Sequence, residues 1–120
     1  MGETYIRMRV HASPTDPTFE ELDLLVDTGA AYSWLSSELL KKLGVKPTRR
    51  SRFRTIKGDI ILRDVGHVFV EYEGEMAPTA VVFAEKEDAS VFGLHALESL
   101  GLEVDPATMQ VRKSEALLAL

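Results

Sequence analysis

A single stretch constrains the fold of this chain most: an apolar strand that runs into an acid and a turn. Residues 24–26, Leu-Leu-Val, lead directly into Asp27, and Thr28, Gly29 and Ala30 then break the strand pattern. Removing a carboxylate from water costs several kcal/mol unless it is paired, hydrogen-bonded or neutralised, so an acid at the end of a buried strand indicates a function. Gly29 permits a tight turn that can aim backbone N–H groups back at Asp27.

Alternating apolar and polar residues predict strands through most of the chain. Residues 5–11 alternate in this way, and residues 19–26 are predicted to form the second strand of a hairpin. Lys57, Gly58 and Asp59 are typical of a hairpin tip. From residue 49 to residue 83 the pattern is β throughout, with the turns separating residues 52–56, 60–63, 65–72 and 77–83, and a last strand is predicted at residues 109–113. The predicted fold class is therefore mostly β.

Two short helices interrupt the strands, at residues 38–43 and 94–100. Ser36 or Ser37 provides an N-cap for the first helix. Gly44 and Gly101 follow the last helical residues and are expected to end the helices in the left-handed conformation. Trp34 is most simply a core residue next to the Asp27 turn.

Composition narrows the class of protein. With 120 residues and 45% hydrophobic content, residues 1–120 are expected to form a single domain with a real core. The net charge of −5 argues against a general nucleic-acid partner. The chain has no cysteine and its three histidines, His11, His67 and His95, lack metal-ligand spacing, so no metal and no cofactor is expected.

The first residues of the sequence do not have the pattern of a signal peptide. Met1 is followed by Gly2, Glu3 and Thr4, with neither a basic region nor a long apolar segment. No signal peptide, membrane span or membrane partner is therefore expected. A cytoplasmic location is the default prediction.

The segment Val-Asp-Thr-Gly-Ala-Ala-Tyr-Ser at residues 26–33 resembles the active-site loop of retropepsin-like aspartic proteases. Their signature is Asp-Thr/Ser-Gly-Ala followed, three residues later, by Ser or Thr, which is Ser33 here. Their second half carries a hydrophobic-hydrophobic-Gly motif before its helix, and Val91, Phe92 and Gly93 occupy that place. The resemblance extends from the strand before Asp27 to Pro106.

This resemblance implies a closed β-barrel of the acid-protease type with its active site on the two-fold axis of a homodimer. Two-lobed relatives carry two Asp-Thr-Gly loops, whereas this chain has one, so two copies must meet to pair Asp27 with its mate. Retroviral members place an acid after the loop and an arginine after the second glycine. Here Ala31 and Leu94 stand at those positions, which favours the small cellular or prokaryotic type over a viral-type interface.

The same resemblance assigns roles to single residues. Thr28 would reach across the two-fold axis, and Gly29 would line the cleft with its backbone. Ile56, Lys57 and Gly58 would form a flap that closes over an extended peptide or protein substrate. The expected activity is that of an aspartic endopeptidase, in which two Asp27 carboxyls activate water.

Other interpretations of these residues remain open. Asp27 could close a simple turn, and the chain could be a catalytically silent module that binds peptides or dimerises. A serine-hydrolase triad through Ser33 or Ser37 lacks any Gly-x-Ser-x-Gly pattern. Four arginines on one predicted strand suggest an exposed strand face rather than a phosphate-binding strip in this acidic protein: Arg49, Arg50, Arg52 and Arg54.

The end of the chain is rich in leucine. Residues 114–120 read Ser-Glu-Ala-Leu-Leu-Ala-Leu, and a group of apolar side chains of this kind indicates an interaction surface. This tail is predicted to join the N-terminal strand in the dimer seam, as chain termini do in the family it resembles.

Overall fold

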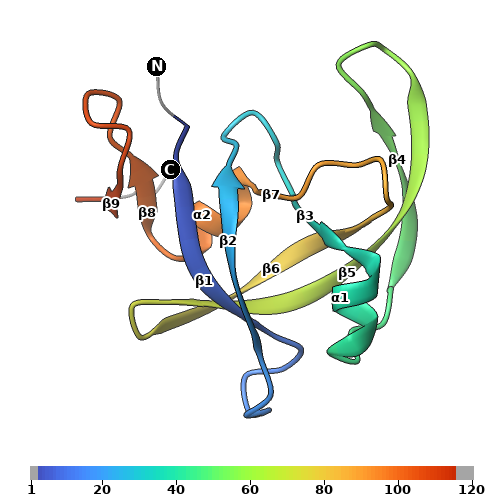
Figure 1. The fold of residues 1–120 in the computed structure, drawn as a ribbon, viewed down its shortest axis with the longest axis horizontal. Helices are drawn as coiled ribbons and strands as arrows, with labels where there is room; N and C mark the ends of the chain where they lie inside the picture. Colours follow the sequence, from blue (N-terminus) through green and yellow to red (C-terminus); the bar gives the residue numbers. More distant parts are fainter. Residues whose placement is uncertain (1–2, 116–120) are drawn as a thin grey trace, which may run out of the picture.

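The computed structural model describes residues 3–115 as nine strands and two short helices (Figure 1). The strands are β1 (Tyr5–His11), β2 (Glu20–Val26), β3 (Ser33–Ser36), β4 (Arg49–Arg54), β5 (Ile60–Tyr72), β6 (Glu75–Ala84), β7 (Val91–Phe92), β8 (Leu102–Val104) and β9 (Val111–Lys113). The helices are α1 (Ser37–Lys42) and α2 (Leu94–Ser99). The prediction of a mostly β fold with two short helices is confirmed.

Seven strands form one sheet, in the order β1-β2-β7-β3-β6-β5-β4. Because β1 also pairs with β5, through Arg9 to His11, the sheet closes on itself into a barrel. Closure satisfies the backbone groups that an open edge would expose. It leaves β4 outside the ring, attached to β5 alone, so the β4–β5 hairpin projects from the barrel (Figure 1).

Strand β5 differs from the prediction, which divided it into residues 60–63 and 65–72. It is one continuous strand of 13 residues. The strand that it pairs with changes along its length, but its own backbone does not break. Its first part pairs with β4, and from Val65 onward it pairs with β6. Asp64 interrupts the apolar pattern only because its side chain lies on the outer face, opposite Arg50.

The barrel interior is filled by alternate residues of β1, β5 and β6, together with one face of each helix. Ile6, Met8 and Val10 point inward from β1, and Leu40 and Leu97 do so from α1 and α2. Burial of such side chains is the main source of stability in a barrel of this size.

The prediction that Trp34 is a core residue is wrong. The side chain is only half-buried, and its ring packs edge-on against Phe53 of the hairpin with the ring centroids 5.2 Å apart. The indole therefore lies between the barrel and the projecting hairpin rather than inside the barrel.

The helix boundaries agree with the capping signals. The Ser36 hydroxyl accepts a hydrogen bond from the Leu39 N–H, and α1 and α2 are followed by Gly44 and Gly101 at positive φ (84° and 69°). Strand β8 was not predicted, and it pairs with a last strand, β9, that is shorter than predicted. The tail predicted to join the dimer seam lies outside the described residues from position 116 onward.

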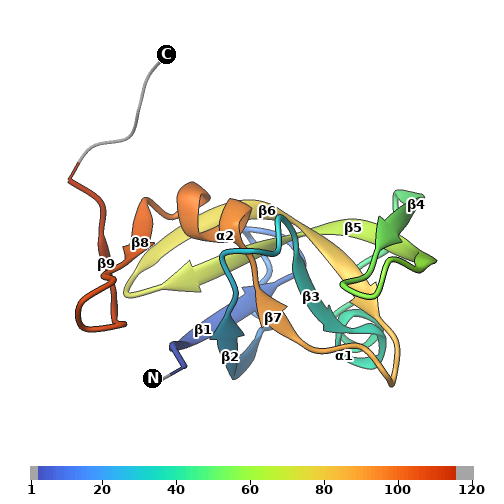
Figure 2. The same ribbon diagram turned by 90° about the horizontal axis from the view of Figure 1, so that it is seen from above.

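The two peripheral features lie at opposite ends of the molecule. Figure 2 shows the β8–β9 pair at one end and the β4–β5 hairpin at the other, with the β2–β3 loop between them. Within residues 3–115, no helix is long and apolar enough to cross a membrane.

Candidate active site

Asp27 lies just beyond the end of β2, on the loop that leads to β3. The Gly29 N–H donates a 2.9 Å hydrogen bond to its carboxylate, and the Ala30 N–H donates to its carbonyl oxygen at 3.1 Å. These bonds close the tight turn that the sequence predicts. The expectation of a buried strand is wrong, because β2 is half-buried and the Asp27 side chain is exposed in the single chain. The carboxylate is therefore open to solvent and to a second molecule.

Strand β7 lies between β2 and β3 and forms a hydrogen bond with the start of the Asp27 loop. It runs parallel to β2, with Val26 opposite Phe92, and the Asp27 N–H donates to the Phe92 carbonyl at 3.0 Å. On its other side β7 pairs antiparallel with Trp34 of β3. Both strands that flank the loop are thus fastened to the hydrophobic-hydrophobic-Gly motif.

The start of α2 makes a second set of bonds to the same loop. The backbone N–H groups of Leu94 and His95 donate to the carbonyls of Ala30 and Ala31, at 2.8 and 3.0 Å. The first N–H groups of a helix have no partner within the helix, so the loop supplies the acceptors that they need. These contacts position the backbone of the Asp27 loop without using its carboxylate.

Gly93 packs directly against the far end of this loop. A Cβ added to Gly93 would lie 2.5 Å from the carbonyl carbon and oxygen of Tyr32, so only glycine fits there. Its N–H donates a 2.9 Å hydrogen bond to the Ser33 hydroxyl, which is buried. Sequence reasoning placed Ser33 in the signature but missed this role, although the Asp-Thr-Gly-Ala-x-x-Ser spacing was the available signal. The same bond speaks against Ser33 as an exposed nucleophile.

The hairpin tip predicted as a flap is well defined. The Thr55 N–H donates to the Asp59 carbonyl at 2.8 Å, and Gly58 adopts a positive φ of 93°. The Ile56 side chain, 107% exposed, points entirely into solvent, and Lys57 beside it is exposed as well. In Figure 1 the tip and the β2–β3 loop lie on the same, upper side of the barrel. No part of residues 3–115 covers the Ile56 side chain at this tip.

Aromatic side chains lie between the loop and the hairpin. The Phe53 ring of β4 is 6.1 Å from the Tyr32 ring and meets it edge-on. The Tyr32 hydroxyl accepts a 3.1 Å hydrogen bond from Arg49, which anchors the ring to the hairpin. These half-buried rings form an apolar wall beside the Asp27 loop.

A groove with a cavity volume of about 510 Å³ lies on the opposite side of the loop, next to Thr28. Apolar side chains of α2, β8 and the following turn dominate its lining: Leu94, Leu97, Leu102, Val104 and Met109. Leu94 and Met109 are among the exposed large hydrophobic residues. Exposed apolar surface of this kind is typical of an interaction site.

The remaining charged residues of interest lie away from Asp27. All four β4 arginines are exposed, but only Arg50, Arg52 and Arg54 share the outer strand face, where Arg50 pairs with Asp64 at 3.0 Å. Arg49 lies on the other face of β4, bonded to Tyr32. His11 is buried and bonded to Glu71 at 2.8 Å. Among residues 3–115, no group of three or more His, Cys, Asp or Glu side chains is placed to hold a metal ion.

The Asp27 turn, the hairpin and the hydrophobic-hydrophobic-Gly motif all lie in the part of the chain that a known family model matches. The family model for the "gag-polyprotein putative aspartyl protease" matches residues 19–99, which span the Asp27 turn, the hairpin and Gly93. This chain belongs to that family of retropepsin-like aspartyl proteases.

One solved structure that resembles the chain is a retropepsin-like aspartic protease from Rickettsia conorii. The two chains are 22% identical, with a TM-score of 0.45, and the match covers 88% of this chain and 94% of that one. No curated protein matches the sequence.

Proposed function

We propose that the protein is an aspartic endopeptidase that acts as a homodimer, with Asp27 from each chain in one active site. The observation that carries the proposal is the Asp27 carboxylate itself. It is exposed on an intact Asp-Thr-Gly turn, receives the Gly29 N–H at 2.9 Å, and has its backbone fastened to Phe92 at 3.0 Å. A carboxylate fixed in direction and open on one side is suited to share a water molecule with a mate.

The chemistry requires two carboxyls because one cannot be acid and base at once. Two ionised carboxylates that face each other repel, so an Asp27 pair would hold a single proton between them, as aspartic protease pairs do. The ionised Asp27 takes a proton from water while the water oxygen bonds to the peptide carbonyl carbon, and the protonated Asp27 gives its proton to the carbonyl oxygen. The C–N bond then breaks as the nitrogen takes the proton that the first Asp27 gained from water, while one hydroxyl of the tetrahedral carbon gives its proton to the other Asp27. This releases a carboxylic acid and an amine and leaves the pair with a single proton again.

The groove beside Thr28 supports the proposed dimer. A two-fold interface is self-complementary, and an apolar groove next to the axis can meet its own copy. Leu94, which replaces the arginine of retroviral members, makes this seam apolar where theirs is ionic. The leucine-rich tail after Ser114 would extend the same seam, because Ser114 itself lines the groove.

The substrate that fits this arrangement is an extended stretch of peptide or protein. The hairpin tip of Ile56, Lys57 and Gly58 would close over it as a flap, burying the exposed Ile56 side chain against substrate or the partner flap. The aromatic wall of Tyr32 and Phe53 would line the cleft between flap and loop.

Water is the nucleophile, so the proposed reaction needs no cofactor. A single domain over residues 1–120 and a cytoplasmic location stay predictions.

The test is cleavage of an unfolded protein at about pH 5, since an aspartate pair that shares one proton works best in mild acid. The native chain should cleave it, a statine-type inhibitor should stop cleavage, and the Asp27→Asn variant should be inactive while its fold and dimer persist. Cleavage that survives in Asp27→Asn contradicts the assignment. Peptide binding without cleavage in both proteins would favour the silent binding module instead.

A further inference from the structure

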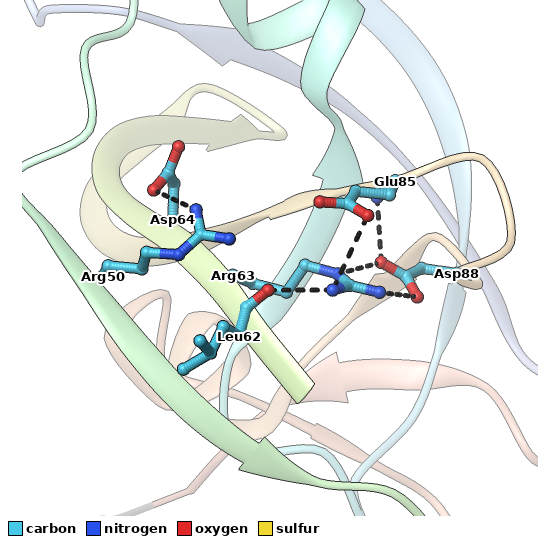
Figure 3. Close-up of polar contacts among 6 residues, drawn as sticks. All are labelled: Arg50, Leu62, Arg63, Asp64, Glu85 and Asp88. Atoms are coloured by element: carbon cyan, nitrogen blue, oxygen red, sulfur yellow. Dashed lines mark hydrogen bonds and ion pairs between the residues drawn. The ribbon is translucent and has the colours of Figure 1, made fainter. Parts of the chain in front are cut away.

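The least exposed Arg or Lys ion pair of the described residues lies at the root of the hairpin. The Arg63 guanidinium donates two hydrogen bonds to the Asp88 carboxylate, from Nε at 2.7 Å and from Nη2 at 3.0 Å (Figure 3). Its third nitrogen donates to the Leu62 carbonyl at 2.8 Å and lies 3.6 Å from a Glu85 carboxylate oxygen. The two paired side chains are only 14% and 12% exposed. A two-pronged pair shielded from water is far stronger and more directional than a surface pair.

The register of the hairpin explains why Arg63 points toward the barrel. Arg63 is opposite Ser51, on the face that also carries Phe53 and Ile61. The next pair along, Arg50 with Asp64, lies on the opposite, outer face, because successive side chains of a strand alternate. Figure 3 shows these two ion pairs on opposite sides of β5.

The partner, Asp88, lies in the turn between β6 and β7 and closes that turn with two hydrogen bonds to Glu85. Its carboxylate accepts the Glu85 N–H at 2.8 Å, and its own N–H donates to the Glu85 carbonyl at 2.9 Å. Strand β7 begins three residues later at Val91 and carries Phe92, whose carbonyl holds the Asp27 N–H. The ion pair therefore joins the hairpin to the segment that fixes the Asp27 loop.

We propose that Arg63 is a positioning residue for substrate binding: its pair with Asp88 sets the angle at which the β4–β5 hairpin stands over the Asp27 loop. This inference rests on the proposed function, in which the hairpin is the flap. Arg63 touches neither the Asp27 turn nor the tip, so it acts through the hairpin root. The hydrogen bonds that hold Asp27, from the Gly29 N–H and to the Phe92 carbonyl, involve neither Arg63 nor Asp88, so losing the pair changes substrate capture and leaves the chemical step intact.

The expected kinetic result is a rise in KM with kcat nearly unchanged. Removal of binding that is equal in the ground state and the transition state has this signature. Arg63→Met and Asp88→Asn should each raise KM by about tenfold, the equivalent of one strong interaction. Arg63→Lys keeps the charge and loses the two-pronged geometry, so its KM should lie between those of the native protein and Arg63→Met. This variant tests the proposal if Arg63→Met does not fold.

The Arg50–Asp64 pair offers a matched control on the same hairpin. It makes one 3.0 Å contact, and its side chains are 55% and 40% exposed. Arg50→Met and Asp64→Asn remove the same charges from the neighbouring residue pair of the hairpin. They should leave KM within about twofold of the native value, because exposed ion pairs contribute little free energy.

Hydrogen–deuterium exchange supplies a readout that needs no activity. In the Arg63 and Asp88 variants the amides of residues 50–62 should exchange faster than in the native protein, while those of β1, β2 and β7 keep their rates. Equal exchange and equal KM in the Arg63 and Arg50 variants would overturn the proposal, and so would faster exchange spread evenly over the barrel. If the native protein cleaves nothing while only the hairpin of these variants loosens, the proposed function fails and the role of Arg63 in holding the hairpin stands.

Discussion

The backbone N–H of Gly93 donates a 2.9 Å hydrogen bond to the side-chain hydroxyl of Ser33, and both residues are buried. This bond joins the two halves of the family signature, since Ser33 ends the Asp27 loop and Gly93 ends the hydrophobic-hydrophobic-Gly motif. The direction of the Asp27 carboxylate therefore depends on residues that are far apart in the sequence.

Ser33→Ala tests this bond. The variant leaves the buried Gly93 N–H without an acceptor, which should lower the free energy of unfolding by about 1–3 kcal/mol. Urea unfolding measures the change, and Ser90→Ala, at an exposed position, should stay within about 0.5 kcal/mol of the native value. Equal stability of the two variants would mean that the Gly93 N–H finds another acceptor.

Gly93→Ala tests the close approach of the two segments. The added methyl group would lie 2.5 Å from backbone atoms of Tyr32, which cannot move without shifting the Asp27 loop. We expect a loss of about 3 kcal/mol or more. Gly58→Ala is the comparison: its Cβ enters open space and only the positive φ of 93° opposes it, at a cost of about 1–2 kcal/mol. A Gly93 variant as stable as the Gly58 variant would contradict the packing described here.

The Arg63–Asp88 pair predicts a dependence of stability on pH. The Arg63 guanidinium, helped by the Glu85 N–H, holds the pKa of Asp88 below its ordinary value of 3.8. Because the folded protein binds this proton more weakly than the unfolded chain, the pair stabilises the fold above that value and loses its effect as pH falls through the lowered pKa.

Asp88→Asn should therefore be less stable than the native protein by about 1–3 kcal/mol at neutral pH, and the difference should shrink below about pH 4. Urea unfolding across that range measures it. Asp64→Asn, which removes an exposed partner, should cost less than about 1 kcal/mol. A difference between Asp88→Asn and native protein that stays constant in acid would show that the charge of Asp88 is not what stabilises the turn.

A charge placed in the groove beside Thr28 should separate the proposed dimer. Leu94→Glu places a charge in this apolar groove and should convert the dimer to monomer in sedimentation velocity, because a buried unpaired charge is costly at an interface. Met76→Glu is the control, since Met76 is 37% exposed, close to the 36% of Leu94, and does not line the groove. A dimer that survives Leu94→Glu would exclude this groove from the interface.

Features that depend on neighbouring residues could be predicted from the sequence. The serine cap before α1 and the glycines that end both helices act within a single turn of chain, as does the Gly29 N–H that bonds Asp27. The hairpin tip follows from Lys57, Gly58 and Asp59 in the same way. Such local signals need no knowledge of the rest of the fold.

Features that depend on distant partners could not be predicted. The closure of the barrel through β1 and β5, the continuity of β5 past Asp64, and the contact between Arg63 and Asp88 all depend on topology. The exposure of Asp27 was missed for the same reason: an apolar run predicts a strand, whereas burial of its end depends on what packs there. In this chain the proposed cover for that end is a second copy.

The most direct test of the proposed mechanism is the separation of the two Asp27 carboxyls in a crystal structure of the assembled protein. We expect their nearest oxygens to lie on either side of a two-fold axis, each within hydrogen-bonding distance, about 2.6–3.2 Å, of one shared water molecule. A structure in which each Asp27 faces bulk solvent alone, with no mate across any symmetry axis, would contradict the account.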